Sequence, residues 1–274
     1  MELFTVNEKT CNRDGICAAV CPRKIIDWHK GASPTPAAGA EQACIRCGHC
    51  VAVCPTASLH HRDMPVESCA PLKPELRLEP EQCAHFIRAR RSIRAYKKQP
   101  VEREKLAQLI DMARYAPSGI NSQGAHWLVI GDREELRRLA GIVIDWMSWL
   151  QAEMPALAKG MHVKQNIEQW QAGTDIILRG APALIVAHAE KENRMAASTC
   201  TIALTTLELA APSLGLGGCW AGYFQAAATV FQPLQSALGL PEGHQCFGAM
   251  MIGYPKFAYH RLPTRKRPTI DWRL

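Results

Sequence analysis

Cysteines are the residues of this chain most able to do chemistry, and seven of the twelve lie between residues 11 and 54. The segment CIRCGHCVAVCP (44–55) has the spacing C-x2-C-x2-C-x3-C-P. In that pattern three close thiolates hold one iron–sulfur cluster and the fourth holds another. A zinc site, which is the alternative, usually takes two pairs of ligands separated by a longer loop. The spacing therefore predicts iron–sulfur clusters.

The preceding segment CNRDGICAAVCP (11–22) repeats the pattern with Asp14 in place of the second cysteine. One interpretation is that Asp14-Gly15 is a turn pair and that the cluster keeps three protein ligands, as in a 3Fe–4S form. The other is that the Asp14 carboxylate ligates the fourth iron. Oxygen is a harder donor than thiolate, so that iron would be labile.

Over about residues 1–62 these two motifs resemble the bacterial two-cluster ferredoxins, and they suggest two pseudo-symmetric halves. The resemblance implies one 4Fe–4S cluster, with the ligands Cys21, Cys44, Cys47 and Cys50. It implies a second, 4Fe–4S or 3Fe–4S, with the ligands Cys11, Cys17, Cys54 and the uncertain Asp14. The other five cysteines have no ligand spacing, and His60-His61 is expected to face solvent.

The length allows one large domain or two modest ones, and the bulk composition fits a folded chain. It has 274 residues, 47% of them apolar, and a net charge of +7. The N-terminus has no apolar signal segment and no apolar run approaches about 20 residues, so we expect a cytoplasmic protein outside the membrane. The proline-rich segment 63–84 is expected to be an extended linker between a domain at 1–62 and another at 85–274.

Helical and strand patterns follow the expected linker. EREKLAQLIDMARYA (102–116) has an apolar stripe of helical period and stops at Pro117. STCTIALTTLELAAPSLGLGG (198–218) predicts a buried helix that opens with a Ser/Thr cap and closes at glycine. Strands are expected at 126–131, 181–189 and 246–255. The alternation lacks a strict βαβ rhythm, which favours the α+β class.

Two basic segments flank this second domain. IRARRSIRAYKK (87–98) has six basic residues, and RLPTRKRP (261–268) lies near the other end of the chain. Arginine forks suit phosphate oxygens, so the two segments would serve one phosphate if the ends of the domain meet. Tyr96 is the single aromatic residue in the first segment, so we do not expect a nucleic-acid site.

Four motifs in order, RRSIRAY, APSGINSQGAHW, LGLGGCWAGYF and GYPKF…RKRP, resemble the FMN-dependent nitroreductase family over about 85–274. The resemblance implies an α+β sandwich that forms a homodimer with FMN at the subunit interface. The residues that match the family's FMN-binding motifs are Arg90, Arg91, Ser92, Arg94, Pro117, Ser118, Asn121, Gln123, Ala221, Gly222, Arg265 and Arg267. The sequence departs from the family at Gly124-Ala125 and Ala221, which leaves the substrate and the nicotinamide preference open.

The roles of single residues follow from flavin chemistry. Arg94 is expected to stabilise the negative charge of reduced flavin, and Asn121 to hydrogen-bond the polar edge of the ring. No acid–base group is needed, because flavin N5 does the chemistry. A Trp- and Met-rich segment (145–172) is either a lid over the flavin or ordinary core.

The sequence thus predicts a ferredoxin–nitroreductase fusion. Electrons would pass from the iron–sulfur clusters, an external donor or NAD(P)H, through FMN, to a small aromatic acceptor such as a nitroaromatic or a quinone. The alternatives are a non-catalytic electron-transfer or redox-sensing protein, and a different reduction, such as that of an enone, on the same scaffold.

Overall fold

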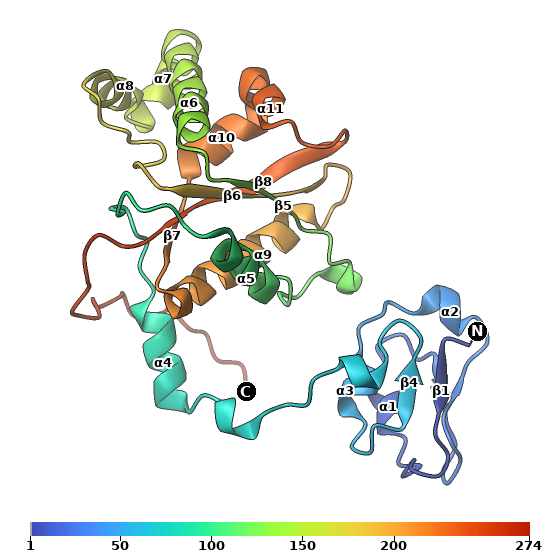
Figure 1. Cartoon of the computed structure of the whole chain (residues 1–274). Helices are drawn as coiled ribbons and strands as arrows, with labels where there is room; N and C mark the ends of the chain where they lie inside the picture. Colours follow the sequence, from blue (N-terminus) through green and yellow to red (C-terminus); the bar gives the residue numbers. More distant parts are fainter. Residues whose placement is uncertain (1) are drawn as a thin grey trace. The chain divides into compact units, whose positions relative to one another are not determined.

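The computed structural model describes residues 2–274, which form two compact units (Figure 1). The first unit runs to Leu78 and includes residues 120–122. The second contains 79–119 and 123–274. No helix among residues 2–274 is long and apolar enough to cross a membrane.

The first unit is built from very short elements. Strand β1 (Phe4–Val6) pairs antiparallel with β4 (Leu59–His61), and β2 (Ile26–Asp27) with β3 (Thr35–Pro36). The helices are α1 (Ile16–Val20), α2 (Ala40–Ala43) and α3 (His49–Val53). A few buried side chains, Phe4 and Leu59 among them, form a small core together with Cys17 and Cys21. A core of this size rarely supports a fold without metal or disulfides.

The segment expected to be an extended linker is partly helical. Two single 3-10 turns, η1 (Val66–Ser68) and η2 (Pro74–Leu76), interrupt it, and residues 67–80 are all exposed. Helix α4 (Pro80–Ala89) then begins inside the range 63–84. Pro80 suits the first helical position, and the Gln82 side chain accepts from the Glu79 backbone N–H at 2.9 Å.

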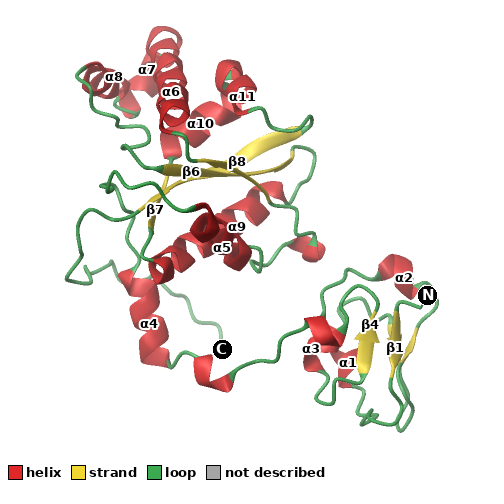
Figure 2. Cartoon of the chain, viewed as in Figure 1, coloured by secondary structure: helices red, strands yellow, loops and turns green. Residues whose placement is uncertain are grey.

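The second unit contains an antiparallel sheet of four strands in the order β5-β6-β8-β7. Figure 2 labels β6, β7 and β8 of this sheet. These strands are β5 (His126–Ile130), β6 (Ala183–Glu190), β7 (Gly217–Trp220) and β8 (His244–Gly253). The three strands expected from sequence are present, and β7 is an addition.

Helices cover both faces of this sheet (Figure 1). On one face lie α5 (Arg103–Ala113) and α9 (Ala196–Ala210). On the other lie α6 (Arg133–Glu153), α7 (Pro155–Gly160), α8 (Val163–Gln171), α10 (Gly222–Val230) and α11 (Gln232–Leu238). Strand β6 is buried on both sides, with Leu184 and Val186 in one core and Ile185 and Ala187 in the other.

The helix expected over 198–218 is shorter than its apolar pattern. It begins at Ala196 without a side-chain cap and ends at Ala210. The 3-10 turn η4 (Ala211–Leu214) follows, with Pro212 near its start and the left-handed Gly215 after it. The chain then continues as strand β7. Proline cannot continue an α-helix, so the apolar pattern covers the end of α9, the turn η4 and the start of β7 rather than one helix.

Histidines from three neighbouring strands meet at one end of the sheet. His126 pairs in register with His188, and the His188 and His244 Nδ1 atoms are 3.0 Å apart. The His126 ring centroid lies 5.6 Å from that of His188 and 4.9 Å from that of His244. Burial, followed by the neighbouring His244 and His126, lowers the pKa of His188 to about 4. Within residues 2–274 no three His, Cys, Asp or Glu side chains converge to hold a single metal ion, these histidines included.

The depressed pKa makes the stability of the protein depend on pH. In the unfolded chain His188 binds a proton near pH 6.5, whereas in the folded chain it binds one only near pH 4. Stability is therefore lost as the pH falls through this window. When the pH is lowered from 7.5 to 5.5, the free energy of unfolding in urea should fall by about 1.4 kcal/mol more for the native chain than for His188→Gln. The control His85→Gln, at an exposed position, should keep the native pH dependence.

Candidate functional site

Four cysteines of the first unit line one hollow. They are Cys21, Cys44, Cys47 and Cys50, and the wall between them is apolar. About 400 Å³ of the hollow is free of protein atoms, and part of it is open to solvent. Three of these thiols come from the second cysteine segment and Cys21 comes from the first. They are spread around the hollow, as the ligands of a cluster with several irons must be.

The remaining predicted ligands line a second hollow, in which about 320 Å³ is free of protein atoms and part is open to solvent. These are Cys11, Asp14, Cys17 and Cys54. Here three groups come from the first segment and Cys54 from the second. Each segment therefore sends its last cysteine to the other hollow. All eight predicted ligands fall into the two groups that the ferredoxin resemblance implied.

The two segments have the same backbone conformation at intervals of 33 residues. Arg13 and Arg46 have positive φ, and Gly15 and Gly48 both have φ of 73°. The N–H of Arg13 donates to Cys11 Sγ at 3.4 Å, and that of Arg46 donates to Cys44 Sγ at 3.4 Å. These turns aim backbone donors at sulfur and start helices α1 and α3.

Burial sets the proton affinity of several thiols. It raises the pKa of Cys50 to about 11 and also raises that of Cys17. Burial acts in the same direction on Cys54, but donors from Ser58, Thr56 and Leu59 hold its pKa below the ordinary value. The Ser58 N–H lies 3.2 Å from Cys54 Sγ. Iron is bound by thiolate, so metal binding must release the protons of the buried thiols.

Asp14 lines the second hollow and also makes a local turn. Its Oδ1 accepts from the Ile16 N–H at 3.2 Å. One carboxylate oxygen is therefore used at the start of helix α1. The contact is compatible with both interpretations of Asp14, because the second oxygen remains for a metal.

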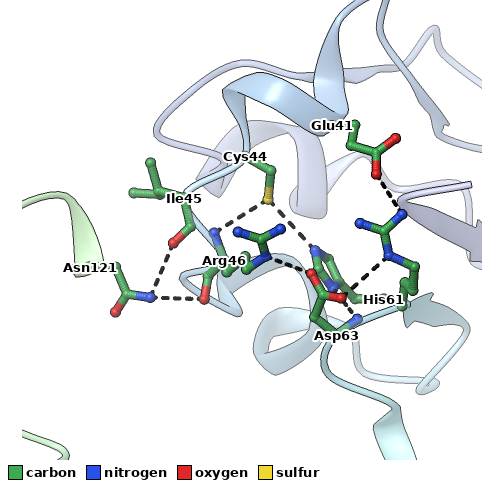
Figure 3. A network of polar contacts seen from close by, with 8 residues as sticks. Glu41, Cys44, Ile45, Arg46, His61, Asp63 and Asn121 are labelled. Atoms are coloured by element: carbon green, nitrogen blue, oxygen red, sulfur yellow. Dashed lines mark hydrogen bonds and ion pairs between the residues drawn. The ribbon is translucent and has the colours of Figure 1, made fainter. Parts of the chain in front are cut away.

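A polar network surrounds Cys44 (Figure 3). His61 Nε2 lies 3.6 Å from Cys44 Sγ, and His61 Nδ1 accepts from the Asp63 N–H at 3.1 Å. The Asp63 carboxylate pairs with Arg46 at 2.6 Å and with Arg62 at 3.3 Å. His61 is 3% exposed, so the expectation that it faces solvent was wrong. Burial lowers its pKa, although the carboxylate of Asp63 opposes this.

In the second unit the predicted segment 90–94 lies along strand β7. The Ile93 N–H donates to the Gly218 carbonyl at 2.9 Å. A Cβ on Gly217 would lie 2.3 Å from Ile93 Cγ1, so glycine is required there by packing. The segment continues beside 254–256, because Lys97 N–H donates to the Tyr254 carbonyl and Lys256 N–H to that of Ala95, each at 2.9 Å.

The arginines of this segment have different partners. Arg90 forms a 2.6 Å ion pair with Glu208 of α9, whose side chain is 6% exposed. Arg91 lies over the Tyr259 ring, 5.9 Å from its centroid. Arg94 is exposed and donates to the Ser92 carbonyl at 3.5 Å. Sequence reasoning missed Glu208, because a single acidic residue in an apolar helix carries no motif.

Arg179 is a further cation that the sequence did not indicate. Burial raises the pKa of the Cys219 thiol on β7, and the cations Arg94, Arg179 and Arg90 partly oppose this, while Glu208 adds to it. Arg179 thus lies near Cys219 together with Arg94. The sequence offers only the following Gly180 as a turn signal, because the left-handed backbone of Arg179 (φ 58°) is visible in the structure alone.

The predicted turn 117–123 is strained. Ile120, Asn121 and Gln123 all have φ near +50°, which β-branched residues such as isoleucine rarely adopt. The Gln123 N–H donates to Ser118 Oγ at 2.9 Å. The Asn121 side-chain nitrogen donates to the Ile45 carbonyl at 3.1 Å and to that of Arg46 at 2.9 Å (Figure 3). Only the side-chain oxygen of Asn121 therefore remains for a further hydrogen bond.

The other predicted cofactor residues lie in two places. Ala221 is buried and Gly222 starts helix α10, with open space where a Cβ would lie. Arg265 and Arg267 belong to the tail 256–274, in which every residue is exposed. The start of this tail meets residues 91–95, through the Lys256 N–H to the Ala95 carbonyl and through Tyr259 below Arg91.

The Trp- and Met-rich segment divides between core and surface. Trp146 and Met147 are buried in α6. Trp149 and Met154 are 46% and 45% exposed, respectively. The core interpretation is therefore confirmed for Trp146 and Met147, and the lid stays a prediction for the exposed residues.

Comparisons with known proteins identify both parts of the chain. The model of the nitroreductase family matches residues 87–254, and that of a 4Fe-4S dicluster domain matches 9–59. The first match covers more than half of the chain, which therefore belongs to the nitroreductase family. It is an oxidoreductase of this type that also carries a 4Fe–4S dicluster domain.

The relatives are consistent with this assignment. A protein of Archaeoglobus fulgidus, provisionally named NADH dehydrogenase/NAD(P)H nitroreductase, is 28% identical over 64% of this chain and 87% of its own. An FMN reductase [NAD(P)H] of Bacillus subtilis is 28% identical over 60% of this chain and 62% of its own. The crystal structure of a Bacteroides fragilis nitroreductase with bound FMN is 25% identical, with a TM-score of 0.58, and covers 69% of this chain and 96% of that one.

The two equivalent glycines provide a matched test of the first unit. A Cβ on Gly15 would lie 2.5 Å from the Trp28 ring, whereas one on Gly48 meets only the flexible Met64 at 3.2 Å. Both alanine variants incur the cost of a left-handed backbone, roughly 1–2 kcal/mol. Gly15→Ala must also displace the ring, at about 1–3 kcal/mol more. Hydrogen exchange should therefore accelerate at least tenfold more in α1 of Gly15→Ala than in α3 of Gly48→Ala.

The buried ion pair gives a prediction for the second unit. Arg90→Ala leaves the Glu208 carboxylate buried without its cation, which should lower the free energy of unfolding by about 3 kcal/mol. Arg91→Ala loses only a contact with the exposed Tyr259 and should cost less than about 1 kcal/mol. The double variant Arg90→Ala/Glu208→Gln should recover part of the loss in urea unfolding. Equal losses for both single variants would contradict this account.

Proposed function

We propose that this chain passes electrons from two iron–sulfur clusters, or from NAD(P)H, through FMN to a small organic acceptor, such as a nitroaromatic or quinone-like compound. The family match, the dicluster domain and the FMN-bound neighbour support this proposal. Because the expected electron donor and the flavin domain share one chain, the donor is held at high effective concentration.

The observation that carries the proposal is the lining of the two hollows in the first unit. One presents four thiols, and the other presents three thiols and Asp14. We assign a 4Fe–4S cluster to Cys21, Cys44, Cys47 and Cys50. We assign a 4Fe–4S or 3Fe–4S cluster to Cys11, Cys17, Cys54 and Asp14. Cysteines committed to iron favour a reducing compartment, such as the cytoplasm.

The residues of the second unit fit an anionic, flat cofactor. FMN, when bound, would supply the hydride or single-electron chemistry at its ring. Arg90, Arg91, Ser92 and Arg94 would lie on its anionic side, and the cations near Cys219 support this role. Ala221 and Gly222 would let the ring approach the backbone, since no atom lies within 4 Å of a Cβ placed on Gly222.

The turn 117–123 would hold the polar edge of the ring. Pro117, Ser118 and Gln123 shape the turn, and Asn121 would contact the ring through its side-chain oxygen. Because the Asn121 nitrogen already donates to two carbonyls, this contact requires a donor on the flavin.

A homodimer would complete the site. Arg265 and Arg267 lie on an exposed tail that also carries exposed Phe257, Leu262 and Trp272. A surface tail with such side chains favours burial against a second subunit. Its arginines would then meet the phosphate of the bound cofactor.

The experiment is anaerobic purification with measurement of iron, sulfide and flavin, followed by turnover with dithionite or NAD(P)H. We expect two clusters and one FMN per chain, and reduction of a nitroaromatic or a quinone. Absence of both chromophores after reconstitution would overturn the proposal. Bound cofactors without turnover on nitro, quinone and enone acceptors would support an electron-transfer or sensing role.

A substitution at Asp14 tests the cluster assignment. Asp14→Cys supplies the missing thiolate, which binds iron more strongly than a carboxylate does. We expect the variant to keep two 4Fe–4S clusters in air, while the native protein shows an EPR signal of a 3Fe cluster. Air-exposed native protein without that signal would contradict a labile fourth iron. Asp14→Asn, which keeps a turn-forming side chain, is the matched control and should remain oxygen-sensitive.

A further inference from the structure

The first unit consists of two halves related by the repeat of the cysteine segments. At one pair of equivalent positions, both halves carry a side chain with a ring N–H, but the surroundings of the two rings differ. His61 and Trp28 are separated by the same interval of 33 residues as the cysteines. His61 Nε2 lies 3.6 Å from Cys44 Sγ, whereas Trp28 Nε1 is buried and has no hydrogen-bond partner within the described chain. At this pair of positions a side chain therefore supplements the backbone donors to sulfur in one half only, while in the second hollow the Thr56 hydroxyl lies 3.7 Å from Cys54 Sγ.

The position of the proton on His61 follows from the geometry. The Asp63 backbone N–H can only donate, and it points at His61 Nδ1 from 3.1 Å. Nδ1 must therefore be an unprotonated acceptor, which leaves the proton of the neutral ring on Nε2. The Nε2–H is the atom directed at the sulfur of Cys44.

The surrounding contacts fix this arrangement. The Asp63 carboxylate is held by Arg46 and Arg62, and Arg62 also pairs with Glu41 at 2.6 Å. His61 lies in strand β4, whose partner is β1, and its side chain is buried. The imidazole is thus held by its strand and by the backbone of Asp63. Cys44 Sγ receives a second N–H from the Arg46 backbone at 3.4 Å.

We propose that His61 is a positioning residue that donates an Nε2–H···S hydrogen bond to Cys44 and thereby raises the reduction potential of the cluster in that hollow. The inference rests on the proposed function, because it requires a cluster on Cys21, Cys44, Cys47 and Cys50. A hydrogen bond to sulfur stabilises the more negative, reduced form of a cluster more than the oxidised form, so it favours reduction. His61 binds no iron in this assignment.

Three substitutions separate the donor from the packing. His61→Phe keeps a ring but removes both nitrogens. His61→Asn keeps an acceptor for the Asp63 N–H but is too short to reach the sulfur. His61→Gln places its amide nitrogen near the position of Nε2 and should restore the donor. Trp28→Phe is the matched control in the other half, since it removes an N–H that has no sulfur partner.

The test is EPR-monitored redox titration of both clusters in the anaerobic holoprotein. We expect His61→Phe and His61→Asn to lower the reduction equilibrium constant of one cluster about tenfold, a shift of about 59 mV for one electron. The potential of the other cluster should not change. His61→Gln and Trp28→Phe should both keep native potentials. Fe–S stretching bands should shift more in heavy water in the native protein and in His61→Gln than in His61→Phe and His61→Asn, which keep only the backbone donor of Arg46 to Cys44.

The outcomes distinguish two failures. Native protein that forms no clusters, by iron and sulfide analysis, would overturn the proposed function itself. Native and variant proteins with full clusters and unchanged potentials would overturn the role of His61 and leave the proposed function standing. If His61→Phe loses iron, the comparison is made with His61→Asn, which keeps the acceptor for the Asp63 N–H.

Discussion

The structure of the first unit depends on an exchange of cysteines between two segments. Each hollow takes three groups from its own turn and one thiol from the other segment. Neither half can therefore complete a four-ligand site alone. The left-handed turns at Gly15 and Gly48 make this possible, because they start the helices that lead to Cys21 and Cys54. With so small an apolar core, metal binding would contribute directly to the folding free energy of this unit.

The second unit follows a different constraint, which is close packing of the segment 90–94 against strand β7. Glycine at 217 lets Ile93 approach, and the buried Glu208 holds Arg90 by a charge-assisted hydrogen bond. Arg94 and Arg179 then lie near the same strand, where their charge acts on Cys219. The proposed anion site is thus positioned by packing around β7. One of its arginines, Arg90, already forms an ion pair with the carboxylate of Glu208.

Much of the organisation could be read from the sequence. The C-x2-C-x2-C-x3-C-P spacing and its repeat predicted which residues line the two hollows together, since ligand spacing on one short turn is a local property. Helix 103–113 and the strands in 126–130, 183–190 and 244–253 matched their patterns, with shifted ends. The break between α9 and β7 was missed, because an apolar run buried on all sides has the same composition in a helix and in a strand.

The sequence alone determined which residues are available to bind iron and which motifs belong to the nitroreductase family, because both depend on residue type and short spacing. Only the tertiary structure decided which cysteines share a hollow, that Glu208 pairs with Arg90, and that His61 turns its Nε2 toward Cys44. It also brought His126, His188 and His244 together from three strands. The physical reason is that hydrogen bonds and burial depend on distances between residues far apart in the chain. A linear pattern does not record those distances.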